Sequence, residues 1–309
     1  MRYTISVIVP TLNRSKDLSV FVESLKAQTI HPTELVIVDA GAESDLEQEL
    51  RMQLQDTDIQ LQYVRSIPGT SLQRNVAMEI AVGDIFFFFD DDIILEPTYI
   101  EETLPCFDLP HNPPVGAVLG TFTSPYTLGR VQQIYSKIFR ISHTVKGDRA
   151  KMMGSSDIQW LIRPSKVVPV PVCSGGRVAY RRECFEKEKW DDFLPGYTMG
   201  EDVEISYRIS KNWTLVQTPD ALLFHKKSDE SRDARPERIA RRIFSRFYIF
   251  NKNLPKTPRN IGAFLWWNIG VVSLYGLSSL REETPKATLK GIKRGYHLCL
   301  QQVRKGSVK

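Results

Sequence analysis

The chain has 309 residues, of which 42% are hydrophobic and 25% charged, and its net charge is +5 at pH 7. This composition excludes a disordered chain, a collagen-like chain and a coiled coil, and the length suits one large domain or two smaller ones. The four cysteines lack CxxC or other metal-ligand spacing, which argues against a disulfide scaffold or a zinc ribbon and favours a reducing compartment.

The first ninety residues alternate between predicted strands and predicted helices. We expect strands at 3–9, 34–38, 59–64 and 84–89, and helices at 17–28, 43–54 and 71–82. This order predicts an α/β fold with a Rossmann-like, mostly parallel sheet flanked by helices. The run that opens the chain stops at Pro10 and is too short for a secretory signal, so we expect a cytoplasmic protein.

The chain from residue 116 onward is less regular. The pattern predicts a strand at 116–123, a helix at 128–142, an extended stretch at 160–172, a helix at 201–210 and short strands at 214–217 and 221–224. Within this part, Ser174-Gly175-Gly176 indicates a turn or a close approach of the backbone to another group.

An acidic triplet, Asp90-Asp91-Asp92, directly follows four consecutive phenylalanines. Ionised carboxylates this close repel one another. A divalent cation is the simplest counter-charge, because hard cations take carboxylate oxygens. Ligands bind parallel sheets at the carboxyl ends of the strands, and the triplet stands at such an end. The sequence therefore favours a metal site that could hold a diphosphate, with a solvated acidic loop as the alternative.

Other polar residues allow both a functional and a structural interpretation. Asp39 ends a predicted strand and either contacts a nucleoside or forms the turn before Gly41. Asp202 opens a predicted helix and is either a general base or a helix cap. His225 is a metal ligand or an ordinary structural histidine. The chain has no GxGxxG after the first strand and no GxxxxGK, which disfavours a dinucleotide oxidoreductase and a P-loop NTPase.

Taken together, these features form one ordered set of motifs. The segments are SVIVPTLNR (6–14), VDAG (38–41), SLQRNVA (71–77), FFFFDDD (86–92), CSGGRVAYRR (173–182), GEDVEISYRI (200–209) and the following His225. Over about residues 4–226 the chain resembles the family 2 inverting glycosyltransferases, which have the GT-A fold. The resemblance implies transfer of a sugar from a nucleotide-diphosphate donor, with inversion at the anomeric carbon and with Mg²⁺ or Mn²⁺ as cofactor.

The resemblance also implies roles for the matching residues. Nucleotide and donor contacts are expected from Pro10, Thr11, Asn13, Arg14, Asp39, Arg74, Asn75, Asp90 and Asp91. Metal ligation is expected from Asp92, Asp90 and His225. Contacts to the donor sugar and the acceptor are expected from Ser174, Gly175, Gly176 and Glu201. Asp202 is the expected catalytic base, with Glu201 beside it in the catalytic site.

Two other functions remain open. A sugar nucleotidyltransferase would need a Gly-rich loop bearing Arg or Lys after the first strand, where this chain has PTLNRSKD. A non-catalytic protein of the same fold would dock on membranes or act as a scaffold. The complete set of acidic residues and His225 argues against this second alternative.

The charge is unevenly distributed along the chain. Residues 1–225 have a net charge of −8 and residues 226–309 a net charge of +13, which suggests a polyanionic partner for the C-terminal part. Residues 236–250 mix arginines with apolar side chains at helical spacing, and 260–280 contain no charge. We therefore expect an anionic membrane surface to bind residues 235–309, with a core-closing helix and a spanning helix as alternatives, and no nucleic-acid partner.

These observations predict a two-part organisation. We expect a GT-A catalytic domain at 1–228, with a nucleotide-binding half at about 1–123 and an acceptor-binding half at about 124–228. A helical, basic C-terminal extension follows at 229–309. The resemblance implies a glycan or lipid-linked acceptor in cell-surface polysaccharide synthesis, which an enzyme peripheral to the cytosolic face of a membrane could reach.

Overall fold

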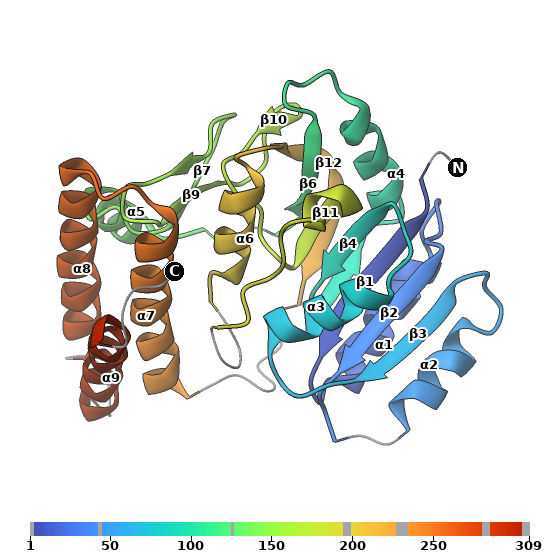
Figure 1. Ribbon diagram of the computed structural model, residues 1–309, viewed down its shortest axis with the longest axis horizontal. Helices are drawn as coiled ribbons and strands as arrows, with labels where there is room; N and C mark the ends of the chain where they lie inside the picture. The colour runs from blue at the N-terminus through green and yellow to red at the C-terminus, as the bar shows by residue number, and fades with distance from the viewer. Residues whose placement is uncertain are drawn as a thin grey trace.

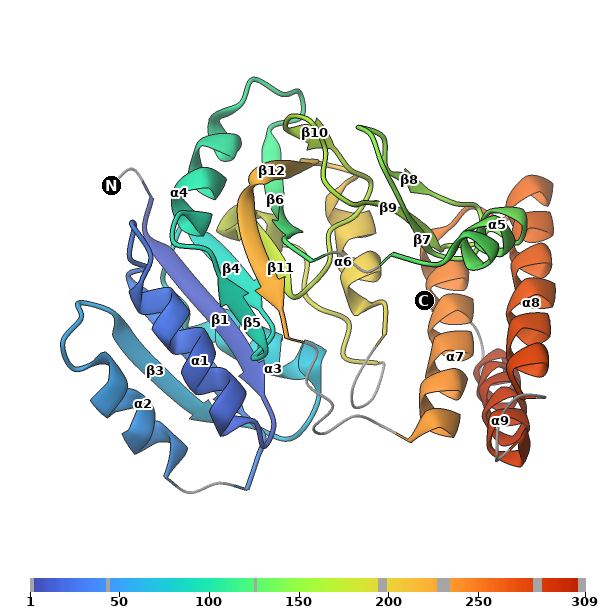
Figure 2. The same cartoon turned by 180° about the vertical axis from the view of Figure 1, so that it is seen from behind.

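The computed structural model describes residues 3–42, 45–124, 127–193, 199–226, 234–279 and 285–304. A nine-stranded sheet forms its centre, with the strand order β10-β12-β6-β11-β4-β1-β2-β3 and with β5 paired to β12. Helices α1 and α2 cover one face of the sheet, and α3 and α6 cover the other (Figures 1 and 2). Helices α7, α8 and α9 stand side by side at one end of the molecule.

The N-terminal half is the predicted alternation of strands and helices. The strands that pair in parallel are β1 (Ile5–Thr11), β2 (Glu34–Asp39), β3 (Gln60–Arg65) and β4 (Ile85–Phe89). The helices between them are α1 (Ser15–Lys26), α2 (Leu46–Leu54) and α3 (Thr70–Ile80). Strands β2 and β4 are buried along their whole length, which explains their continuous apolar sequences. The predicted α/β fold is confirmed.

The second half completes the sheet with strands β6 (Val115–Phe122), β11 (Arg177–Arg181) and β12 (Thr214–His225). Strand β12 is parallel to β6, whereas β11 lies antiparallel between β4 and β6. The sequence pattern did not predict β11. The two short strands expected at 214–217 and 221–224 are one irregular strand, whose register against β6 shifts between Gln217 and Leu222.

The antiparallel direction of β11 determines which loops lie at the carboxyl ends of the parallel strands. Because β1, β2, β4, β6 and β12 run the same way, their carboxyl ends meet at one edge. Strand β11 begins at that edge, so the turn at 174–176 just before it lies beside the acidic triplet after β4. The short strands β5 (Ile93–Leu95) and β10 (Val168–Pro169) add to β12.

A second, small sheet lies beside this edge. It consists of β7 (His143–Val145), β8 (Lys151–Met152) and β9 (Ile158–Leu161). Helix α5 (Arg130–Ile138) precedes it and is shorter than the predicted 128–142, because the chain turns at Arg140, whose φ is +54°, and becomes extended. Helix α4 (Tyr99–Thr103) and two 3₁₀ turns at Leu104–Asp108 and Arg182–Phe185 were not predicted.

The C-terminal part is helical, as predicted, with α7 (Arg235–Asn253), α8 (Pro258–Ser279) and α9 (Pro285–Arg304). Glycines let α9 approach α7 closely: a Cβ at Gly291 would lie 2.7 Å from the Pro236 carbonyl oxygen. Within the described ranges, α8 is the helix that is long and apolar enough to cross a membrane, by length and composition only. One face of α8 packs on the small-sheet region, where the buried Trp267 donates to Asp157 at 2.8 Å.

Buried charges join α7 to α6 (Glu201–Ile209). The Lys252 ammonium lies 2.5 Å from the Asp191 carboxylate and 2.9 Å from that of Glu204, which is completely buried. Arg208 also pairs with Glu204, at 2.7 Å, and Asn253 donates to the Glu204 carbonyl oxygen. The C-terminal region therefore braces the helix that begins with Glu201 and Asp202.

This bracing is testable by substitution of Lys252. We expect Lys252→Met to lower the free energy of unfolding by about 1–3 kcal/mol. The substitution removes one partner of the buried Glu204 carboxylate, which still pairs with Arg208. The matched control is Arg51→Met, which breaks an exposed pair with Glu47 on α2 and should cost less than about 1 kcal/mol. Urea unfolding of both variants measures the difference, and equal losses would contradict the bracing.

Candidate active site

The acidic loop after β4 is anchored through its middle residue. The carboxylate of Asp91 accepts hydrogen bonds from the Thr11 hydroxyl at 2.8 Å and from the Arg14 guanidinium at 2.9 Å. Burial raises the pKa of Asp91 to about 6, while Arg14 and Thr11 act in the opposite direction. The loop is thus tied to the end of β1.

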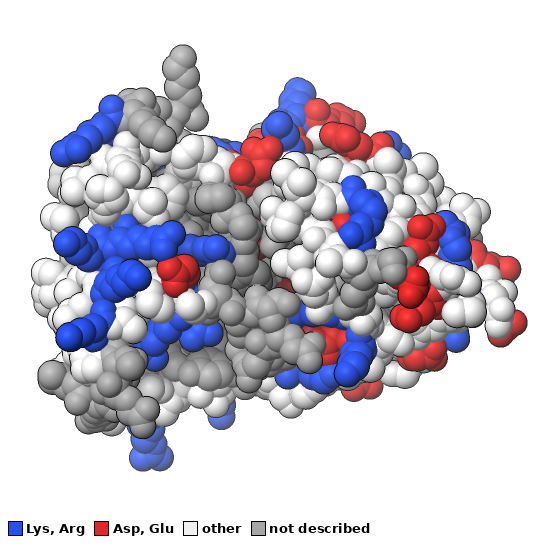
Figure 3. Space-filling view, turned by 90° about the horizontal axis from the view of Figure 1, so that it is seen from below, with Lys and Arg blue, Asp and Glu red and all other residues white. Residues whose placement is uncertain are grey.

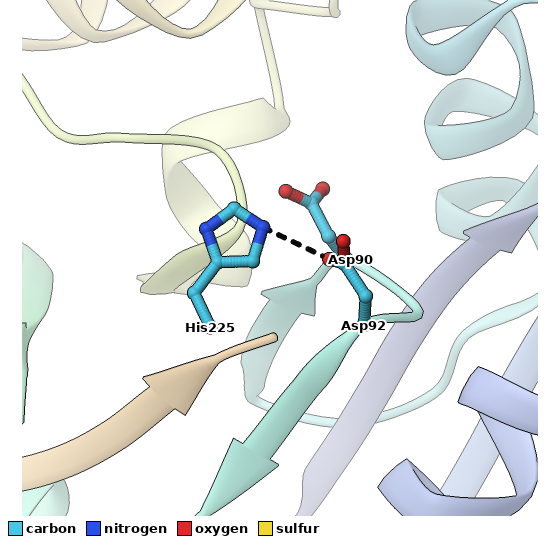
Figure 4. Close-up of side chains that lie close together, drawn as sticks. All are labelled: Asp90, Asp92 and His225. Atoms are coloured by element: carbon cyan, nitrogen blue, oxygen red, sulfur yellow. Dashed lines mark ion pairs between the residues drawn. The ribbon is translucent and has the colours of Figure 1, made fainter. Parts of the chain in front are cut away.

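The two outer residues of the loop face β12. The potential ligand atoms of Asp90, Asp92 and His225 all lie within 4.8 Å of one another (Figure 4). The His225 Nε2 atom is 3.0 Å from an Asp92 carboxylate oxygen, and the imidazole stacks on Phe122 with ring centroids 5.6 Å apart. Two carboxylates and one imidazole suit a divalent cation such as Mg²⁺ or Mn²⁺. The residues present therefore fit the predicted metal.

Arg74 links this loop to helix α6. Its side chain is buried, with Nη2 3.3 Å from Asp90 and Nη1 3.1 Å from Glu201. The guanidinium lies over the ring of the buried Trp190, 4.5 Å from its centroid. Burial raises the pKa of Glu201 to about 7, the nearby Asp202 adds to this rise, and Arg74 opposes it. One arginine thus holds carboxylates from two separate elements.

The glycine turn before β11 closes on these groups. A Cβ at Gly176 would overlap the Asp90 carboxylate, and one at Gly175 would lie 2.7 Å from Arg74 Nη1. The Gly175 N–H donates to Asp202 Oδ2 at 3.2 Å, and the other oxygen of Asp202 accepts from the Val203 N–H at 2.8 Å. The Asp202 carboxylate is therefore held in place at the first turn of α6.

The ends of β1 and β2 form the other side of the site. Asp39 is buried and accepts from the Gly41 N–H and the Tyr63 hydroxyl, both at 2.6 Å, and from Arg65. The Gln73 amide donates to the carbonyl oxygens of Thr11 at 3.0 Å and Val38 at 2.7 Å, which joins the two strand ends.

The structure brings together most of the residues expected at the site. Pro10 and Thr11 lie at the end of β1, and Asn13, which has a φ of +54°, accepts from the Ala42 N–H at 2.8 Å. Asn75 differs, because its amide donates to and accepts from the Trp190 backbone, both at 2.9 Å. In this structure Asn75 holds Trp190 in place beneath Arg74.

Several residues of the site were not predicted. They are Tyr63, Arg65, Gln73, Phe122, Arg177 and Trp190. Gln73 and Arg177 fall inside motif segments, so the motifs could have pointed to them. Trp190 lies outside every motif and has no signal in the sequence.

A cavity of about 360 Å³ opens next to His225. It lies between the ends of β6 and β12 and the small sheet. Its wall includes Phe122, Trp160, Ser174, Arg177 and His225. The cavity therefore borders both the metal-binding group and the glycine turn.

Comparisons with known proteins agree with this arrangement. A sequence model described as "Glycosyl transferase family 2" matches residues 6–188. The chain is 24% identical to a hyaluronan synthase of Pasteurella multocida over 294 residues, which cover 88% of this chain and 29% of that protein. It is 32% identical to a glucosyl-dolichyl phosphate glucuronosyltransferase of Haloferax volcanii over 126 residues, 39% of this chain and 38% of that protein. The chain thus spans only about a third of the length of these curated relatives.

Two solved structures share the fold. The mannosyltransferase PcManGT from Pyrobaculum calidifontis, in complex with GDP-Man and Mn²⁺, superposes with a TM-score of 0.57 at 16% identity, covering 98% of this chain and 87% of that one. GalNAc-T7 with UDP, GalNAc and Mn²⁺ gives 0.56 at 14% identity, covering 99% of this chain and 57% of that one. Because the family match spans more than half of the chain, this protein belongs to glycosyl transferase family 2, and it has the GT-A fold of these glycosyltransferase enzymes.

Proposed function

We propose that the protein is an inverting glycosyltransferase that moves a sugar from a nucleotide-diphosphate donor to a hydroxyl group of the acceptor. This proposal rests on one observation. At the carboxyl ends of the strands, three side chains that suit a divalent cation lie near Asp202, whose carboxylate is fixed by two hydrogen bonds. Asp90 and Asp92 approach His225, and Arg74 connects Asp90 to Glu201, the neighbour of Asp202.

The chemistry needs no covalent nucleophile. Asp202 takes the proton of the acceptor hydroxyl, whose oxygen then attacks the anomeric carbon from the side opposite the diphosphate, and this direct displacement inverts the configuration. A divalent cation held by Asp90, Asp92 and His225 would supply Lewis-acid stabilisation of the departing diphosphate. Glu201, which pairs with Arg74, would hydrogen-bond the acceptor or the donor sugar.

The proposed donor site follows the strand ends. Thr11 and Asp39 would contact the nucleoside, with Pro10, Asn13 and Arg14 next to them. The names of the solved structures that share the fold include GDP-Man or UDP, and Mn²⁺ in both cases, which supports a nucleotide-sugar donor and either Mg²⁺ or Mn²⁺ here.

The acceptor is the less direct part of the proposal. The curated relatives are named as a hyaluronan synthase and a glucosyl-dolichyl phosphate glucuronosyltransferase. Their names support a glycan or a lipid-linked glycan as the acceptor class. We infer that residues 1–228 carry the transfer, with the nucleotide in the half before about residue 123 and the acceptor in the half after it.

We also propose that residues 235–309 dock the enzyme on an anionic membrane at its cytoplasmic face. Figure 3 shows Lys and Arg side chains gathered on the left, over the C-terminal helices, while Asp and Glu are concentrated over the N-terminal part. Two neighbouring helices also carry exposed apolar side chains, here called the ridge. The ridge consists of Val131, Ile134, Ile138, Leu265, Trp266 and Ile269, from α5 and α8.

The two halves of the ridge are held together by contacts. The Trp266 indole donates to the Ile138 carbonyl oxygen at 2.7 Å, and its ring stacks on Phe139. The Tyr135 hydroxyl donates to the Gly270 carbonyl oxygen, also at 2.7 Å. Exposed apolar side chains in a part of the chain rich in Lys and Arg are the pattern of an interfacial membrane element.

The first test concerns the base. Asp202→Asn should lower turnover about 10²–10⁴-fold, since a positioned base contributes that much, and leave nucleotide binding unchanged. Sugar transfer from UDP- and GDP-sugars measures turnover, and a thermal-shift assay with UDP or GDP and Mn²⁺ measures binding. The same substitution with full turnover would rule out Asp202 as the base.

The second test concerns the metal group through Gly176. Gly176→Ala should displace the Asp90 carboxylate and weaken Mn²⁺ binding about 10–100-fold, the usual effect of disturbing the support of a ligand. Gly262→Ala is the control, because a Cβ there meets nothing within 4 Å. Electron paramagnetic resonance of free Mn²⁺ reports binding, and unchanged affinity in Gly176→Ala contradicts the assignment.

The third test concerns the membrane. The double variant Ile134→Glu with Ile269→Glu should bind phosphatidylglycerol-containing vesicles at least about tenfold more weakly, because burying each isoleucine contributes about 1.5–3 kcal/mol. Met52→Glu on α2, also at an exposed apolar residue, should bind normally. Vesicle co-sedimentation measures both, and equal binding of all forms would count against the ridge.

A further inference from the structure

The cavity beside His225 is lined by a buried cation, Arg177, that makes no ion pair with any residue the structure describes. Arg177, the first residue of β11, is only 5% exposed and lines the cavity wall. Its Nη1 donates to the Gly120 carbonyl oxygen at 2.7 Å, while its buried Nε has no hydrogen-bond acceptor in the described part of the chain. None of the ion pairs of the described residues includes Arg177.

Burying a charged group without an ionic partner costs free energy of folding. Burial lowers the pKa of Arg177 to about 10, and electrostatic interactions with Tyr99, Cys173 and Asp202 oppose this shift. The guanidinium remains charged at neutral pH and keeps donors to spare. Charged groups in protein interiors are normally paired, so an unpaired one that borders a cavity indicates an anionic ligand.

The remaining wall suits a sugar ring. Trp160 presents an aromatic side chain to the cavity, and its indole is fixed by a hydrogen bond to the Ser142 hydroxyl at 3.1 Å. Phe122 is covered by Arg177 at 4.3 Å and by His225, so it links the cavity to the metal group and is not the stacking surface. A ring with one apolar face and one anionic substituent could contact Trp160 and Arg177 together.

The location favours the acceptor over the nucleotide. The proposed nucleotide site lies at β1 and β2, and His225 and Phe122 come from β12 and β6 on the far side of β4. Ser174, which lines the cavity, adjoins Gly175, the residue that donates to Asp202. A ring in the cavity would therefore lie close to the proposed base.

We propose that this cavity binds an anionic substituent, a carboxylate or a phosphate ester, on the sugar of the acceptor, and that Arg177 selects it. The proposal rests on the proposed transferase function, since it takes Asp202 as the base. It adds a substrate property, namely negative charge on the acceptor, and a residue that recognises it.

The test compares three probes in the presence of Mn²⁺ and UDP or GDP, by calorimetry or saturation-transfer NMR. The probes are methyl β-D-glucuronide, glucose 6-phosphate and the neutral methyl β-D-glucoside. A charge-assisted hydrogen bond predicts that one anionic probe binds at least about tenfold more tightly than the glucoside. Preference for the first identifies a carboxylate, and preference for the second identifies a phosphate. Equal binding of all three, or binding of none, overturns the proposal.

Two variants assign any preference to this cavity. Arg177→Met should remove the preference and leave Mn²⁺-dependent nucleotide binding intact. If that variant does not fold, Ser124→Glu serves instead, because it adds an anion at an exposed residue of the cavity wall, with Ser124→Gln as its neutral match. Ser124→Glu should weaken binding of the anionic probe and leave binding of the neutral glucoside unchanged. If the variant still prefers the anionic probe to the same extent, the assignment to this cavity is wrong. If the unmodified protein binds neither UDP nor GDP in the presence of Mn²⁺, the proposed transferase function itself is refuted.

Discussion

The crowding of carboxylates at one sheet edge is the constraint on which the rest of the site depends. Asp90, Asp91, Asp92, Glu201 and Asp202 converge there from the β4 loop and helix α6, and like charges at such distances repel. Two arginines offset part of this charge: Arg14 pairs with Asp91 and Asp92, and Arg74 pairs with Asp90 and Glu201. A divalent cation at Asp90, Asp92 and His225 would complete this neutralisation, which is why the same arrangement suits a diphosphate leaving group.

This electrostatic arrangement relies on packing elsewhere in the chain. Arg74 keeps its position because it rests on Trp190, which Asn75 holds through two backbone hydrogen bonds. Helix α6 keeps its position because Lys252 of α7 pairs with Glu204. The basic C-terminal helices are therefore part of the support of the site, as well as the proposed contact with a membrane. An enzyme whose support also binds the membrane would hold its active site at a fixed distance from lipid-linked substrates.

The sequence predicted those parts of the fold in which local pattern and tertiary role agree. Strands β1 to β4 and their helices follow from apolar periodicity, and their ends differ from the prediction by a few residues. Strand β11 was missed because RVAYR is short and becomes a strand only through pairing with β4 and β6. Motif order located the acidic loop and the glycine turn, whereas Trp190 and the cavity role of Arg177 depend on contacts between distant segments, which no local pattern encodes.

The metal-dependent donor site is tested by anomalous X-ray diffraction, at the manganese absorption edge, from crystals grown with Mn²⁺ and UDP or GDP. We expect one strong peak in contact with the carboxylate of Asp92 and with His225, next to the diphosphate of the nucleotide. A manganese peak away from the β4 loop, or a bound nucleotide whose diphosphate has no metal beside it, would contradict the central claim that this loop and the end of β12 form the metal-dependent donor site.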